Sequence, residues 1–189
     1  MIYDKIWLKE TIEKETSLKF APRSRFLTML LLRLKGNERW PINDFLISLR
    51  YFEYWEYKRL TNSLSVLGQL HHIYWHCKFR RNQIKNNLFI EPFTIQGGAN
   101  LVHPGYRKIP EFVKIGTNCT ILPMVLLGKK VPGINGDIKV GDGCYISTGV
   151  TILGPVIIGD NVIIGAGAVV TKDVPDNVTV VGVPAKVIR

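Results

Sequence analysis

The chain has 189 residues, of which 46% are hydrophobic and 21% charged, and its formal net charge at pH 7 is +10. This length suits one domain or two small ones, and the composition is that of a globular protein rather than a disordered chain. Its three cysteines, Cys77, Cys119 and Cys144, are odd in number and far apart. They exclude a disulfide framework and a close-spaced zinc motif, and they fit a reducing, cytoplasmic compartment.

Positive charge is concentrated in the first half of the chain. Residues 1–89 contain 16 Lys/Arg and 8 Asp/Glu, whereas residues 90–189 contain 9 and 7. Such a surface fits nucleic acid, anionic lipid or an acidic polymer, or only a solvated helical face. We favour the solvated face, and we expect no nucleic-acid partner because the basic and aromatic residues alternate at helical spacing without forming a known module.

The first 85 residues predict an α-helical domain, with helices over about 3–16, 24–35, 42–61 and 65–85. The apolar run 26–34 is too short to span a bilayer and contains Arg33, so it predicts a packed helix, with a membrane-surface contact as the alternative. The N-terminus opens with alternating charges and shows no cleavable signal. We therefore expect a cytoplasmic protein, and membrane association through the basic helical half stays open.

A histidine pair lies on the last of these predicted helices. His72 and His76 are four residues apart, so they share one helix face and could bind a metal. No third ligand is apparent beyond Cys77, which points elsewhere. Ordinary packing is the better interpretation, and no metal is expected.

The second half of the chain changes period. An aliphatic residue recurs every six positions, with one register jump of thirteen, at Ile109, Ile115, Ile121, Leu127, Val140, Ile146, Ile152, Ile158, Ile164 and Val170. A second small or branched residue follows each after four positions, at Val113, Cys119, Val125, Cys144, Val150, Val156, Val162, Ala168 and Val174. A six-residue period fits neither a strand alternation nor a helical stripe. It predicts a solenoid in which three hexads complete one triangular coil and the repeated slots stack in a dry core.

Three segments identify the kind of solenoid: "VHPG" before the coils, "GDGCYISTGVTILGPVIIGDNVIIGAGAVVTKDVPDNVTV" within them and "VGVPAKVI" at the end. Residues 86–189 resemble the left-handed parallel β-helix of the hexapeptide-repeat acyltransferases, in the branch of serine acetyltransferase and exopolysaccharide O-acetyltransferases. The fold class expected is mainly β, with an α-helical N-terminal domain over residues 1–85. The helical half has no motif that we can match to the family.

The resemblance implies an O-acetyltransferase that uses acetyl-CoA. His103 of "HPG" matches the family's catalytic base, although in phase with the repeat it falls in an aliphatic slot, six residues before Ile109. A polar ring on a dry axis is costly, so we expect an irregular coil that turns the imidazole outward. A purely structural histidine is the alternative.

The resemblance also implies a donor site and an assembly. Matched residue by residue, Thr148, Ala166, Thr171 and Lys172 would line the pantetheine groove, and Lys186 would meet a phosphate of CoA. Ordinary coil packing for Ala166 and solvated surface for the lysines are the alternatives. The family is trimeric, with some members dimers of trimers, so a homotrimer is expected.

The chain departs from serine acetyltransferase at the acceptor site. Val102 stands where that family has an acid before the histidine, and Phe89 stands near the position of the acid that orients the imidazole. Glu91 and Glu111 are the nearest replacements. The loop after Lys130 also lacks the arginine that the resemblance to serine acetyltransferase leads us to expect as the partner of the serine carboxylate. A sugar or exopolysaccharide hydroxyl is therefore the expected acceptor, with serine as the alternative.

Two other functions are known alternatives for a solenoid of this kind. A zinc carbonic anhydrase of the same fold needs three histidines per metal, and His103 is alone in the repeat region. A non-catalytic scaffold or binding module remains the alternative of another class.

Overall fold

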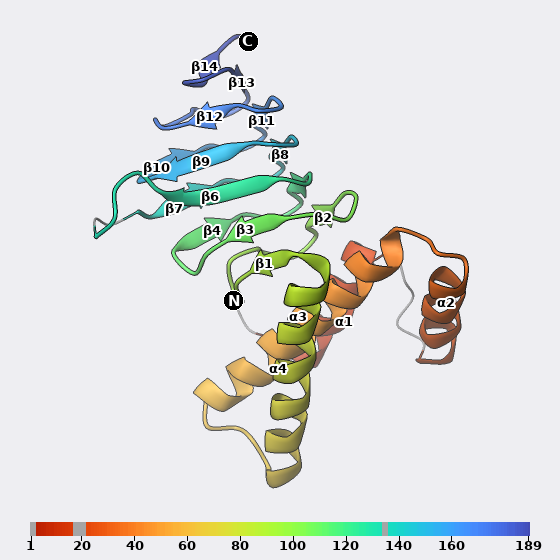
Figure 1. Cartoon of the computed structure of the whole chain (residues 1–189). Coiled ribbons are helices and arrows are strands. Elements are labelled where there is room, and N and C mark those ends of the chain that lie inside the picture. The colour runs from red at the N-terminus through yellow and green to blue at the C-terminus, as the bar shows by residue number, and fades with distance from the viewer. Residues whose placement is uncertain (1–2, 17–21, 134–135) are drawn as a thin grey trace. The chain divides into compact units, whose positions relative to one another are not determined.

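The computed structural model describes residues 3–16, 22–133 and 136–189 of the chain. It divides the chain into two compact units, Met1–Asn86 and Asn87–Arg189. The first is helical and the second is built from short strands (Figure 1).

The helical unit contains, in its described part, α1 (Lys5–Thr16), α2 (Pro22–Leu34), α3 (Arg39–Leu60) and α4 (Val66–Asn86). These are the four helices that the sequence predicts, with ends shifted by at most a few residues. Gly36 follows α2 in the left-handed region, with φ of 62°, where a residue without Cβ ends a helix at least cost. α1, α3 and α4 pack together around a core that includes Leu8, Ile12, Ile47 and Tyr54.

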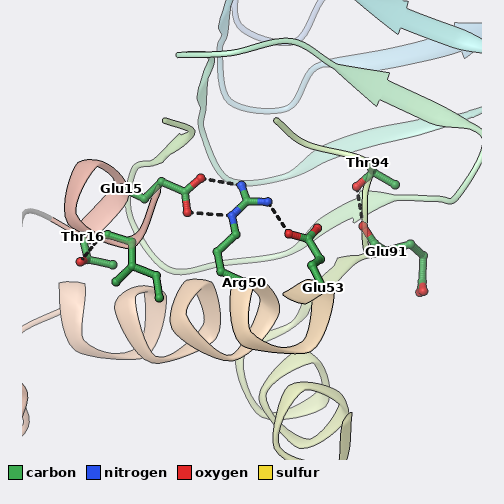
Figure 2. A network of polar contacts seen from close by, with 7 residues as sticks. Glu15, Thr16, Arg50, Glu53, Glu91 and Thr94 are labelled. Carbon is green, nitrogen blue, oxygen red and sulfur yellow. Dashed lines mark hydrogen bonds and ion pairs between the residues drawn. The ribbon is translucent and has the colours of Figure 1, made fainter. Parts of the chain in front are cut away.

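A charged network is buried inside this helical unit. Arg50 on α3 donates from Nε and Nη2 to the two carboxylate oxygens of Glu15 on α1, at 3.0 and 2.5 Å, and from Nη1 to Glu53, at 2.7 Å (Figure 2). All three side chains are at most 1% exposed. Burial alone would lower the pKa of Arg50, but the two carboxylates raise it overall, so the guanidinium stays charged. A buried pair of this kind is costly to break, because removing one partner leaves an uncompensated charge.

The second unit is a parallel β-helix of three sheets. Its strands are β1 (Leu88–Ile90), β2 (Asn100–Leu101), β3 (Arg107–Ile109), β4 (Val113–Ile115), β5 (Thr120–Ile121), β6 (Val125–Lys129), β7 (Ile138–Val140), β8 (Tyr145–Ile146), β9 (Thr151–Gly154), β10 (Val156–Ile158), β11 (Ile163–Ile164), β12 (Val169–Val170), β13 (Thr179–Val181) and β14 (Lys186–Val187). In the described residues the five-stranded sheet is ordered β1-β3-β6-β9-β12, the three-stranded sheet β10-β7-β4 and the six-stranded sheet β14-β13-β11-β8-β5-β2. From β3 to β12 successive strands visit the three sheets in turn, and every strand pairing in the described residues is parallel except that of β13 with β14.

The core of the β-helix follows the predicted hexads. All ten aliphatic slots from Ile109 to Val170 are at most 5% exposed, and all nine second slots from Val113 to Val174 are at most 7% exposed. Equivalent slots pair across neighbouring coils, as Ile121 does with Ile146 and Ile146 with Ile164. Cys119 and Cys144 lie in this core, as the sequence predicts.

One edge of the β-helix is held by a ladder of glycine and aspartate. The backbone N–H of Thr117 donates to the carboxylate of Asp142, that of Asp142 to Asp160, and that of Asp160 to Asp176, at 2.5 to 2.8 Å. A glycine stands below each carboxylate. A Cβ added at Gly141 would lie 2.2 Å from Oδ1 of Asp160. The glycines that recur after the aliphatic slots at this edge are therefore a steric requirement of the ladder.

Candidate functional site

One corner of the β-helix collects residues that the sequence singles out. β2, β5, β8, β11 and β13 pair in register through Leu101, Ile121, Ile146, Ile164 and Val180. Two residues beyond each of these, at the end of the strand, stand His103, Pro123, Thr148, Ala166 and Gly182. These five positions are called the His103 corner below. The N–H of Gly149 donates to the carbonyl of Pro123 and that of Gly167 to Thr148, as stacked turns require.

His103 is exposed and does not occupy an aliphatic slot. The slot belongs to Leu101, which is 5% exposed and pairs with Ile121. His103 therefore does not take the slot that a strict six-residue phase assigns to it, and its exposure agrees with the expected irregular coil that turns the imidazole outward. The reason is the length of the segment: Leu101 and Ile109 are eight positions apart, whereas Ile121 and Leu127 are six positions apart.

The two extra residues form a tight turn. His103 has φ of 57° and Gly105 has φ of 145°. A positive φ is costly for a residue with a Cβ, so the surrounding structure must hold His103 in place. A Cβ on Gly105 would lie 3.0 Å from Cβ of Pro123, so the turn rests directly on the coil beside it.

Arg107 is a residue of this turn region that the sequence analysis missed. It is fully buried, and its guanidinium donates to the carbonyl oxygens of Val102, His103, Gly105 and Ile121. Burial lowers the pKa of Arg107 to about 10, so it remains protonated at neutral pH. A signal existed in the sequence: Arg107 stands two residues before Ile109, which is the small slot of its hexad.

The proposed acidic partners of the histidine lie elsewhere. Phe89 is in β1, and its ring centroid is 6.1 Å from that of Tyr106. Glu91 and Glu111 follow β1 and β3, so both leave the five-stranded sheet, whereas His103 leaves the six-stranded one. Neither glutamate belongs to the His103 corner.

Two of the predicted cofactor residues share the corner with His103. Thr148 and Ala166 are both exposed, two and three coils away from His103. With parallel strands about 4.8 Å apart, these steps correspond to roughly 10 and 14 Å along the solenoid. The hydroxyl of Thr148 donates to the carbonyl of Pro123 at 2.9 Å. The corner thus has the exposed imidazole at one end, then the half-buried Pro123, and then the small exposed residues Thr148, Ala166 and Gly182.

The other three predicted cofactor residues lie on two different sheets. Lys186 is exposed on β14, which pairs with β13 at the end of the six-stranded sheet, opposite Val181. Thr171 and Lys172 follow β12 of the five-stranded sheet, so they stand at a different corner. Within one protomer the structure therefore brings together His103, Thr148 and Ala166, and it does not bring Thr171 and Lys172 to them.

The histidines of the helical unit are engaged in packing. Nε2 of His72 lies 2.7 Å from a carboxylate oxygen of Glu56, and the His76 ring stacks on Phe52 at 4.9 Å between centroids. In the described parts of the chain no three His, Cys, Asp or Glu side chains are grouped so as to hold a metal ion. None of the described helices combines the length and apolarity needed to cross a bilayer.

Sequence comparisons point to one group of enzymes. The family description "Bacterial transferase hexapeptide (six repeats)" matches residues 134–172. Galactoside O-acetyltransferase of Escherichia coli is 34% identical over 56% of this chain and 62% of its own length. Serine acetyltransferase of Mycobacterium tuberculosis is 43% identical over 56% of this chain and 47% of its own length. The chain thus spans less than two thirds of the length of these relatives.

Solved structures agree with the sequence matches. The soybean serine acetyltransferase apoenzyme superposes with a TM-score of 0.68 at 25% identity, covering 97% of this chain and 70% of that one. Serine acetyltransferase from Brucella abortus in complex with coenzyme A gives 0.64 at 26% identity, over 97% and 66%. The predicted left-handed β-helix preceded by helices is confirmed, as is the resemblance to hexapeptide-repeat acyltransferases.

Proposed function

We propose that this chain is an acetyl-CoA-dependent O-acetyltransferase in which His103 is the general base. The observation that supports it most is the exposed imidazole at the end of a row of small residues, in line with Thr148 and Ala166. A solved relative with 26% identity binds coenzyme A. An imidazole can take and return a proton near neutral pH, which a thioester transfer to a hydroxyl requires.

The reaction proceeds by direct transfer. His103 accepts the proton of the acceptor hydroxyl while the hydroxyl oxygen attacks the thioester carbonyl carbon. The tetrahedral intermediate collapses as the C–S bond breaks, and the imidazolium returns its proton to the CoA sulfur. The products are the acetyl ester and CoA. A backbone N–H near the corner would stabilise the oxyanion. The buried thiols of Cys119 and Cys144 take no part, since neither reaches the surface.

The donor site extends along the solenoid from His103. Thr148 and Ala166 leave room for the linear pantetheine arm against the backbone, and Lys186 offers a cation to a CoA phosphate. Thr171 and Lys172 stand at another corner, so they can meet the same cofactor only from a neighbouring protomer. This division supports the homotrimer that the resemblance implies, with cofactor grooves between protomers.

Serine is the first acceptor to test. The serine acetyltransferase structures cover 97% of this chain, helical unit included, whereas the match to galactoside O-acetyltransferase covers 56%. The comparisons therefore favour serine over the sugar expected from the sequence. A sugar hydroxyl is the second candidate, because Val102 stands where serine acetyltransferases have an acid and the loop after Lys130 has no arginine, and a serine acceptor needs charged partners for its ammonium and carboxylate groups.

The test is CoA release from acetyl-CoA, measured with a thiol reagent, with serine and a panel of neutral and acidic glycans as acceptors. Turnover with serine supports the first acceptor, and turnover with a glycan alone supports the second. A folded protein that releases no CoA with any acceptor would refute the enzyme and favour a non-catalytic scaffold.

A further inference from the structure

A charged side chain occupies a core slot of the β-helix. Arg107 pairs with Leu88 on one side and with Val125 on the other, and the same column continues through Val150 to Ala168. The other members of this column are apolar, and all five positions are at most 1% exposed. A guanidinium in a dry column is costly unless its donors are satisfied, so its presence needs an explanation.

The donors of Arg107 are satisfied by main-chain carbonyls. Nη2 donates to the oxygens of Val102, His103 and Ile121 at 2.5, 2.9 and 3.0 Å, and Nη1 donates to Gly105 at 3.2 Å. Nε adds a contact to Ile121 at 3.3 Å. Among the described residues no carboxylate forms an ion pair with it. Three of the four acceptors belong to the turn that contains His103.

The turn has a need that the regular corners lack. Two extra residues stand between Leu101 and Ile109, and the left-handed residue is His103 itself, whereas the regular corners have it one position later, at Met124, Gly149 and Gly167. Carbonyls that leave a ladder and face the interior must find other donors. One guanidinium has five N–H donors in a rigid fork and can serve several carbonyls at once, whereas a lysine ammonium has three donors on a flexible stem and an apolar side chain has none.

We propose that Arg107 is a positioning residue for His103: it fixes the peptide groups of the 102–105 turn and thereby the direction of the imidazole at the corner. The role of the turn in acetyl transfer rests on the proposed function, whereas the effect of Arg107 on the geometry of the turn does not. Arg107 does not touch substrate, and it acts only through the backbone that it holds.

The experiment compares R107V, R107M and R107K with the wild-type chain. Valine is the residue that the two following coils have in this column, and methionine fills more of the vacated volume. The readouts are the melting temperature, kcat and KM for acetyl-CoA, and the ring C–H resonances of His103, assigned through H103Q. Val150→Ala is the control, because it opens the same column without touching the turn.

The expected results distinguish an effect on the position of the His103 imidazole from an effect on the stability of the fold. R107V and R107M stay folded, the His103 resonances shift or broaden, and kcat falls at least tenfold while KM for acetyl-CoA changes less than twofold. R107K has fewer N–H donors than arginine, so its kcat and its His103 resonances lie between those of the two apolar variants and those of the wild type. V150A melts at a lower temperature with unchanged kcat and His103 resonances.

Three results would overturn the proposal. They are unshifted His103 resonances in a folded R107V or R107M, a wild-type kcat in both, or a failure of both to fold, which would make Arg107 a residue of stability alone. If the wild-type chain itself releases no CoA, the proposed function fails, and the His103 resonances still decide whether Arg107 positions the turn.

Discussion

The glycine–aspartate ladder makes a sharp prediction about two glycines that look alike in the sequence. Gly141 and Gly128 each follow an aliphatic slot. A Cβ at Gly141 would lie 2.2 Å from Oδ1 of Asp160 and 2.7 Å from the carbonyl of Gly159, whereas a Cβ at Gly128 would meet nothing closer than 3.5 Å. Gly141→Ala should therefore destabilise the β-helix strongly, and Gly128→Ala should not.

The magnitude follows from what must move. Because backbone atoms of the next coil lie within the overlap, the coils must separate locally, and overpacking of this kind costs about 1–3 kcal/mol. The shift also breaks the hydrogen bond from the N–H of Asp142 to Asp160, at 2.7 Å, worth about 1 kcal/mol. Together they lower the free energy of unfolding by roughly 3 kcal/mol, or roughly 12–24 °C in melting temperature for a unit of this size. At position 128 an alanine loses less chain entropy on folding than a glycine does, so Gly128→Ala should raise the free energy of unfolding by about 0.5 kcal/mol.

The assay must report on the β-helix alone. All four tryptophans, Trp7, Trp40, Trp55 and Trp75, belong to the helical unit, so their fluorescence does not follow the strands. Hydrogen exchange of peptides from residues 136–189, measured by mass spectrometry across a thermal series, does. Equal protection in the two variants would refute the steric reasoning.

Three further predictions concern single side chains. Arg50→Met leaves two buried carboxylates without a cation and should cost the helical unit about 3–5 kcal/mol, seen as earlier loss of tryptophan fluorescence in urea; an unchanged midpoint would contradict it. A thiol titration of the native chain should modify Cys77 alone, because burial holds the other two cysteines out of reach; three fast thiols would contradict it. Hydrogen bonds from Arg59 and then from His72 lower the pKa of Glu56. The ionised carboxylate therefore stabilises the folded state fully at a pH above the unfolded-state pKa, and this stabilisation is lost as the pH falls through the lower folded-state pKa. Glu56→Gln should remove that acid-side loss, which is below about 1 kcal/mol for an ion pair near the surface whose Arg59 partner is exposed, and an identical pH profile of unfolding would show that Glu56 makes no such contribution.

The repeat could be predicted from the sequence because each slot has one physical demand. A slot on the axis of a stacked coil needs an aliphatic side chain in every turn, so Ile121, Ile146 and Ile164 could be placed in the core without coordinates. The helices could be placed for a similar reason, since their apolar residues recur at one spacing. The ends of the helices were less certain, because a cap such as Gly36 depends on one or two residues.

The turn at His103 could not be predicted in the same way. A phase argument assumes that no residue is inserted, and two extra residues lie between Leu101 and Ile109. Arg107 was missed because a charged residue is expected to face solvent, although its place before Ile109 is that of a core slot. What keeps it inside is a set of backbone carbonyls, and such acceptors are invisible in a list of side chains. Likewise, the division of Thr148 and Thr171 between two corners follows from which sheet each strand joins.

The proposed mechanism depends on the general base at the His103 corner, and one comparison of variants tests that base directly. His103→Ala and His71→Ala are assayed side by side for CoA release from acetyl-CoA with the acceptor that the wild-type chain uses. His71 is exposed on α4, and its Nδ1 lies 2.9 Å from the carbonyl of Leu67, so its loss controls for removal of any surface imidazole. We predict that H103A keeps its circular dichroism and loses roughly 100-fold or more in kcat, while H71A keeps both. A folded H103A that turns over at the rate of H71A would contradict the proposed mechanism.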